Sequence, residues 1–157
     1  MLETGIDTIP RKLVSSRYDN YAMTLSPDGR WMAYVSDESG GREVYVRPFP
    51  SVDSAKFAIS AGGGLEPLWR RDGRELFFRN TRGDMFAVPV TPGPRFIHGA
   101  PRLLFSQADM ALQEFYRTYD VHPDGKRFLM LSAGAGHSRS LSVIFNWNPG
   151  AAASASP

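Results

Sequence analysis

Three aspartates have the residue type and spacing that could support chemistry, because each stands before a glycine in a recurring short motif. Carboxylates of this kind can bind calcium or transfer protons in catalysis. They recur once per repeat, however, and that recurrence is what a structural role predicts. We therefore interpret the three Asp-Gly pairs as structural turn residues: Asp28 and Gly29, Asp72 and Gly73, and Asp124 and Gly125.

Histidine and serine residues give no second chemical site. His98, His122 and His137 are 24 and 15 residues apart, whereas a metal site needs ligands gathered at fixed spacings. Ser138 lies beside His137, but a catalytic triad needs a base that a third group orients. The G-x-S-x-G motif of many serine hydrolases is absent. We predict no catalytic residues, no metal ion and no cofactor.

The Asp-Gly pairs mark an internal repeat. Their motifs are SPDGRW, RRDGRE and HPDGKR, and the aspartates are separated by 44 and then 52 residues. Proline presets φ at the first central position of a turn, and aspartate caps the backbone two residues further on. Glycine takes the positive φ that closes a hairpin. Each motif therefore predicts a hairpin turn.

Stretches rich in Val, Phe, Tyr and Ile flank the turns and predict β-strands. Strands are expected at about 12–15, 21–25, 31–36, 43–48, 56–60, 66–70, 75–79, 84–90, 102–106, 116–121, 127–132 and 141–147. Hairpin-linked strands with a period of 44–52 residues are typical of β-propeller blades. The prediction is an all-β fold, a β-propeller of three four-stranded antiparallel blades.

The blades divide the chain at its turns and loops. The expected parts are an N-terminal segment with one strand (1–20), blade one (21–64), blade two (65–115), blade three (116–148) and a disordered tail (149–157). Trp69 and Tyr119 fall on the predicted innermost strands of their blades. They are candidates for side chains that face a central channel, and the alternative is that they pack between blades.

Composition excludes several classes of partner. The 157 residues include 18 basic and 16 acidic side chains, a balance too even for a nucleic-acid-binding surface. No apolar run is long enough to cross a membrane, and the first 20 residues contain no apolar core of a signal peptide. Because the chain has no cysteine, it has no disulfide and no thiolate metal site.

One long stretch carries a family resemblance. The runs LSPDGRWMAYVS, EVYVRPFP, GGGLEPLWRRDGRELFFR, YDVHPDGKRFLML and VIFNW, within about residues 20–147, resemble the TolB-like, WD-repeat-like β-propellers of bacteria. They look like the C-terminal half of the propeller attached to bacterial serine/threonine protein kinases. The resemblance implies a six-bladed ring, usually extracytoplasmic, that serves as a sensor or binding platform. The chain departs from that pattern because it has three blades and no kinase motif.

The functional prediction is a non-catalytic binding or scaffold module with a protein or peptide partner, or a small ligand. The alternative is a regulatory propeller fragment of a kinase or of a prolyl-oligopeptidase-type hydrolase. Three blades cannot close a ring. Either the chain is a fragment, or two copies form a six-bladed homodimer in which Lys12–Ser15 completes the other copy's blade three. We expect a cytoplasmic location if the chain is complete, and an extracytoplasmic one if it belongs to a membrane-anchored parent.

Overall fold

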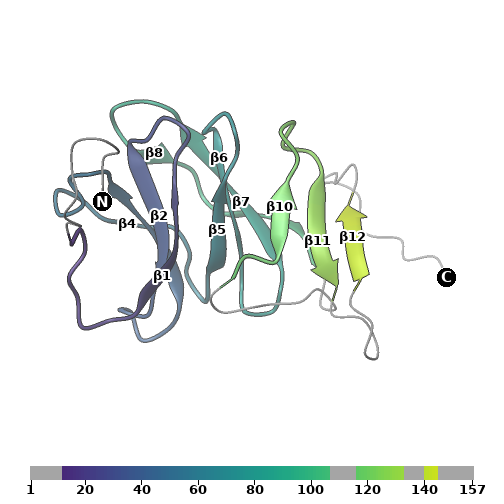
Figure 1. The fold of residues 1–157 in the computed structure, drawn as a ribbon, viewed down its shortest axis with the longest axis horizontal. Helices are drawn as coiled ribbons and strands as arrows, with labels where there is room; N and C mark the ends of the chain where they lie inside the picture. The colour runs from purple at the N-terminus through teal and green to yellow at the C-terminus, as the bar shows by residue number, and fades with distance from the viewer. Residues whose placement is uncertain (1–11, 107–115, 133–139, 145–157) are drawn as a thin grey trace, which may run out of the picture.

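The computed structural model describes residues 12–106, 116–132 and 140–144, and within these ranges the chain forms strands and turns and no helix. Three antiparallel sheets follow one another along the longest axis of the molecule (Figure 1). The all-β prediction is confirmed. The predicted tail (149–157), the end of the last predicted strand, and the hydrolase candidates His137 and Ser138 lie outside the described residues.

Each sheet begins with the strand that precedes an Asp-Gly turn. Sheet one has the order β1 (Asn20–Leu25), β2 (Trp31–Ser36), β3 (Glu43–Pro48), β4 (Phe57–Ala58). Sheet two contains β5 (Leu65–Trp69), β6 (Glu75–Arg79), β7 (Met85–Thr91), β8 (Ile97–His98) and β9 (Arg102–Phe105). Sheet three has the order β10 (Tyr119–Val121), β11 (Phe128–Ser132), β12 (Ser140–Ile144).

The second strand of sheet one shows why the sheets stack. All six residues of β2 are buried, and their side chains alternate between its two faces. Trp31 and Val35 belong to the core shared with sheet two, whereas Met32 and Tyr34 belong to a separate cluster on the opposite face. An unbroken apolar strand is therefore covered on both sides.

Two apolar cores join the three sheets. The first lies between sheets one and two and includes Leu76 and Phe78 of β6. The second lies between sheets two and three, where Phe77 of β6 meets Phe128 of β11 with ring centroids 5.2 Å apart. Consecutive residues of β6 thus reach both neighbouring sheets, and this alternation fixes the sheets side by side.

Sheet two contains five strands, which differs from the four predicted. Both β8 and β9 pair with the edge of β7 that β6 leaves open: β8 with its end at Val90 and Thr91, and β9 with its beginning. The segment between β7 and β9 contains Pro92 and Pro94, which cannot donate backbone hydrogen bonds to a ladder. The predicted fourth strand corresponds to β9, and the additional short strand β8 precedes it on the same edge of β7.

The structure contains no strand at residues 12–15, where one was predicted. Leu13 and Val14 instead pack against the outer face of sheet one, on the cluster that contains Met32 and Tyr34. Covering an apolar sheet face with Leu13 and Val14 removes apolar surface from water, which stabilises this arrangement. The prediction of a strand here was wrong for that reason.

Candidate functional site

The three Asp-Gly turns share one geometry. In each turn the aspartate Oδ1 accepts a hydrogen bond from the backbone N–H two residues later, at 3.1, 3.0 and 2.8 Å for Asp28, Asp72 and Asp124. The following glycine has φ of 70°, 72° and 71° at Gly29, Gly73 and Gly125. These φ values lie in the left-handed region that favours glycine. The carboxylates therefore hold the turns in shape.

The carboxylate of Asp124 in the third turn has a lowered pKa. The backbone N–H of Lys126 lowers the pKa of Asp124 to about 2, and hydrogen bonds from the side chains of His122 and Arg127 act in the same direction. His122 Nδ1 and Arg127 Nη2 both lie 3.0 Å from Asp124 Oδ2. The third turn is thus a small polar cluster in which the aspartate stays ionised in acid.

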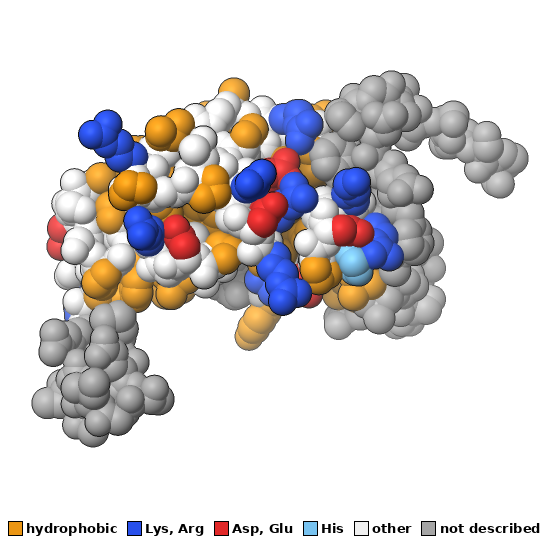
Figure 2. Space-filling view, turned by 90° about the horizontal axis from the view of Figure 1, so that it is seen from above, with side chains coloured by type: hydrophobic (Ala, Val, Ile, Leu, Met, Phe, Trp, Pro, Cys, Tyr) orange, Lys and Arg blue, Asp and Glu red, His pale blue; other side chains and the backbone are white. Residues whose placement is uncertain are grey.

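The turns lie side by side on one face of the molecule, which we call the turn face (residues 26–30, 70–74 and 122–126). Arg70 of the second turn donates a hydrogen bond to the backbone carbonyl of Asp124 in the third, at 3.1 Å. A Cβ added to Gly73 would lie 3.7 Å from Cδ of Pro27 in the first turn. Figure 2 looks onto the molecule from above, where acidic side chains with basic neighbours follow one another among hydrophobic ones.

A pocket of about 270 Å³ opens between the first and second turns. We call it the interturn pocket. Its walls are mostly apolar and include the indoles of Trp31 and Trp69. Asp28 and Asp72 are also among its lining residues, and their side chains are 39% and 44% exposed. The pocket therefore combines mostly apolar walls with two acidic residues.

The two side chains predicted as candidates for a channel lie between sheets. Trp69 is 6% exposed and belongs to the core between sheets one and two, where its indole N–H donates to the carbonyl of Thr24 at 3.3 Å. Tyr119 is 4% exposed and belongs to the core between sheets two and three. Both stand on the first strand of their sheet, but their burial favours the packing alternative.

A buried polar bridge, which the sequence interpretation did not include, links sheets two and three. Glu66 on β5 and Arg79 on β6 are fully enclosed, with Oε2 and Nη1 3.6 Å apart. Thr118, just before β10, donates its hydroxyl to Glu66 Oε1 at 2.8 Å and accepts a hydrogen bond from Arg79 at 3.0 Å. The hydroxyl of Tyr119 donates to the carbonyl of Glu66 at 2.8 Å.

Glu66 also has an unusual backbone conformation, with φ of 55° at a bulge in β5. Ala22 occupies the same position relative to its turn in β1 and has φ of 51°. The third repeat has Thr118 at this position. An alignment of the three repeats on their turns therefore contains the signal: a charged residue where the first repeat has alanine.

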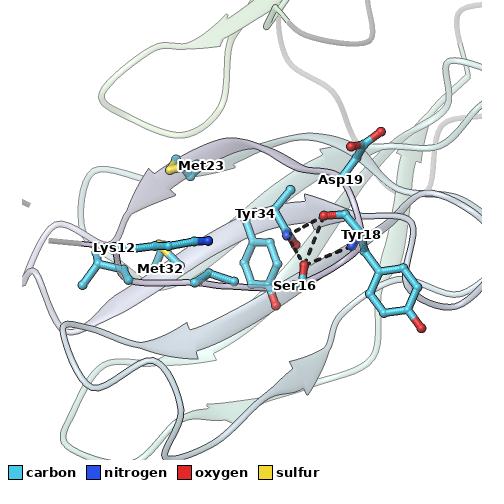
Figure 3. A pocket seen from close by; sticks show the side chains of 10 residues that line it. Lys12, Ser16, Tyr18, Asp19, Met23, Met32 and Tyr34 are labelled. Atoms are coloured by element: carbon cyan, nitrogen blue, oxygen red, sulfur yellow. Dashed lines mark hydrogen bonds between the residues drawn. The ribbon is translucent and has the colours of Figure 1, made fainter. Parts of the chain in front are cut away.

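A second pocket, of about 440 Å³, lies on the outer face of sheet one (Figure 3). Met23, Met32 and Tyr34 line it from the sheet, and Lys12 and Ser16 line it from the N-terminal segment. Burial raises the pKa of Tyr34. Met23 is 63% exposed, so this apolar face is only partly covered.

The described residues contain no cluster of His, Cys, Asp or Glu suited to a metal ion. His98 is exposed on β8, and His122 stands in the third turn, so the structure does not bring them together. In the described part of the chain, no helix has the length and apolar character needed to span a membrane.

Comparison with known proteins gives matches among solved structures only. No family model and no curated protein matches the chain. An oligogalacturonate lyase from Vibrio parahaemolyticus matches with a TM-score of 0.58 and 12% identity, over 83% of this chain and 34% of that one. A protein described as TolB from Agrobacterium tumefaciens matches with a TM-score of 0.55 and 16% identity, over 83% of this chain and 46% of that one.

These likenesses concern the fold, because the identities are low. The chain spans less than half of each of the two structures. The expectation of a TolB-like fold is confirmed at that level, and the stacked antiparallel sheets belong to a fold of the β-propeller kind.

Proposed function

We propose that this chain is a non-catalytic part of a β-propeller that binds a protein or peptide partner through its turn face. The observation that carries the proposal is the contact between turns from different sheets, through Arg70 and the carbonyl of Asp124. Such contacts join three short turns into one continuous surface that stacked sheets hold in place. Binding residues are often found on loops that a rigid scaffold positions.

The use of the charged groups supports a binding role over catalysis. Glu66 and Arg79 are enclosed, with side-chain exposures of 1% and 0%, so a substrate cannot reach them. Each of the three turn aspartates uses one carboxylate oxygen to accept a hydrogen bond from a backbone N–H group of its own turn. A general acid or base needs a proton-transfer partner within hydrogen-bond reach of a bound substrate.

We also propose that the three sheets are three blades of a six-bladed ring, in which sheets one and two are four strands wide and sheet three has three described strands. The other half comes either from the rest of a longer protein or from a second copy. The outer faces of sheet one and sheet three support this proposal, because Met23 and Leu129 are 63% and 42% exposed there. Since Leu13 and Val14 cover their own sheet one, we no longer assign Lys12–Ser15 to a partner's blade.

A peptide selection tests the binding role. A random peptide library displayed on phage is selected against the purified, folded chain, and enriched peptides are titrated while backbone amide signals are followed by NMR. We expect saturable shifts in residues 26–30, 70–74 and 122–126. The chain unfolded in urea is the control and should bind none of the peptides.

Two results would contradict the proposal. One is a selection that yields no saturable binder, or binders that shift only signals far from the turn face. The other is turnover of ester, phosphoester or peptide substrates that survives purification and disappears in a single-residue variant such as Ser138→Ala.

A further inference from the structure

We propose that the interturn pocket binds a cationic side chain, an arginine or lysine of the partner, with the charged group between Asp28 and Asp72. This inference rests on the proposed binding function and names the chemistry that the turn face recognises. It is carried by the internal repeat, because the chain fills the corresponding place between its second and third turns with a cation of its own.

That cation is the guanidinium of Arg70. Its Nη1 lies 2.9 Å from Glu75 Oε2, its Nε lies 3.5 Å from Asp72 Oδ2, and its Nη2 donates to the carbonyl of Asp124 at 3.1 Å. A Cβ added to Gly125 would lie 2.7 Å from the Arg70 Cζ, so the guanidinium sits directly against the third turn. Carboxylates from the second turn and from the start of β6, and a carbonyl from the third turn, thus surround one positive charge.

The interval between the first and second turns keeps the aspartate and glycine of each turn but has no carboxylate in the place of Glu75. Ser26 stands where the second repeat has Arg70, and Trp31 stands where it has Glu75. The short side chain of Ser26 turns back to its own turn, where its hydroxyl donates to Asp28 at 2.6 Å. The space that a guanidinium occupies in one interval is therefore part of the interturn pocket in the other.

The walls of the pocket suit the stem of such a side chain. Trp31, Trp69 and Val90 supply apolar surface for methylene groups, and indole rings also attract cations. Within the described part of the chain, Asp28 Oδ2 lies 3.8 Å from Arg30 and Asp72 Oδ2 lies 3.5 Å from Arg70. These lengths exceed those of charge-assisted hydrogen bonds, so a ligand cation can form shorter ones.

The probe for the test is the peptide Ac-Gly-Arg-Gly-NH2, with the citrulline peptide of the same shape and no charge as its matched control. Binding is followed through the indole N–H signals of Trp31 and Trp69, which Trp→Phe variants assign. We expect saturable shifts of both signals with the arginine peptide and about tenfold weaker binding of the citrulline peptide, equivalent to about 1.4 kcal/mol.

Three variants locate the site. Asp28→Asn with Asp72→Asn keeps the oxygens that cap the turns and removes both charges, so affinity should fall about tenfold. Ser26→Arg recreates the arrangement of the second turn, so its own guanidinium should fill the pocket and abolish binding. Asp53→Asn is the matched control, because Asp53 has a 93% exposed side chain outside the turn face and does not line the pocket, so affinity should be unchanged.

Specific results overturn the inference. Equal affinity for the arginine and citrulline peptides would show that charge is not recognised. Unchanged binding in Ser26→Arg would show that the probe sits elsewhere, and no saturable shift would show that the pocket takes no cation. Selected peptides that keep their affinity in the Asp28→Asn, Asp72→Asn variant would overturn the cation site and leave protein binding standing. If the arginine peptide binds but the phage selection yields no peptide, the cation site stands and the proposed protein binding is contradicted.

Discussion

Replacing Arg79 by methionine is expected to destabilise the fold through the buried bridge between sheets two and three. The change removes the cation and leaves the Glu66 carboxylate enclosed, with 1% side-chain exposure. Methionine has nearly the length of the lost side chain, so the cavity that remains is small. The dominant cost is therefore a buried charge without its counter-charge, which amounts to about 3–5 kcal/mol.

The structure favours the lower end of that range. Glu66 Oε1 still accepts hydrogen bonds from the hydroxyl and the backbone N–H of Thr118, at 2.8 and 3.2 Å. These bonds solvate part of the carboxylate, so we expect a loss of about 3 kcal/mol. Domains of this kind unfold with a free energy of about 5–15 kcal/mol in total, so the loss is large enough to measure by urea denaturation.

Two further variants make the measurement specific. Adding Glu66→Gln to Arg79→Met removes the stranded charge and should recover about 2 kcal/mol of the loss, the non-additivity expected of a coupled pair. Arg82→Met is the matched control, because Arg82 pairs with Asp84 at 3.2 Å while its side chain is 80% exposed. It should cost less than about 1 kcal/mol. If Arg79→Met costs no more than Arg82→Met, or if the double variant is additive, the bridge does not contribute as argued.

Three other outcomes follow from the turns and the open sheet faces. Gly29→Val should lower the free energy of unfolding, measured by thermal denaturation, by about 1 kcal/mol because valine disfavours positive φ. Gly125→Val should lower it by more, because the Cβ of the valine would also contact Arg70. Equal losses in the two variants would contradict this. The carboxyl carbon of Asp124 should titrate with a midpoint near pH 2 when followed by NMR. Because the pKa of this carboxyl is 3.8 in the unfolded chain, the ionised Asp124 contributes its full stabilisation above pH 3.8 and loses it as the pH falls through 2. A midpoint at pH 3.8 would show that the turn does not bind the carboxylate. Light scattering should give twice the mass of the 17.4 kDa chain if a second copy covers the outer faces, and a stable monomer would exclude that closure.

The strands and turns could be predicted because their causes are local. Proline, aspartate and glycine at adjacent positions set the backbone of a turn without help from distant residues. An apolar run such as β2 indicates a strand covered on both faces, and it is buried along its whole length. The sequence pattern predicted the wrong local structure where packing against distant residues decides it. An example is residues 12–15, which cover a sheet face and form no strand.

The buried bridge and the interturn pocket could not be predicted from local patterns. Glu66 and Thr118 are 52 residues apart, and nothing in either neighbourhood indicates the other. Their contact depends on how sheet three packs against sheet two. The pocket likewise exists because two turns from different sheets lie side by side. Both sites form because neighbouring repeats pack against each other. In the sequence, only an alignment of the repeats on their turns indicates them.

That alignment explains how one repeated turn can produce different surfaces. The residue two positions before each aspartate is Ser26, Arg70 or His122. Ser26 leaves its interval open, and Arg70 fills its interval with a guanidinium. His122 lines a hollow of about 430 Å³ at the outer side of sheet three, next to Leu129. A further sheet stacked there would place a fourth turn opposite His122, and the residue that completes this interval would then come from that sheet.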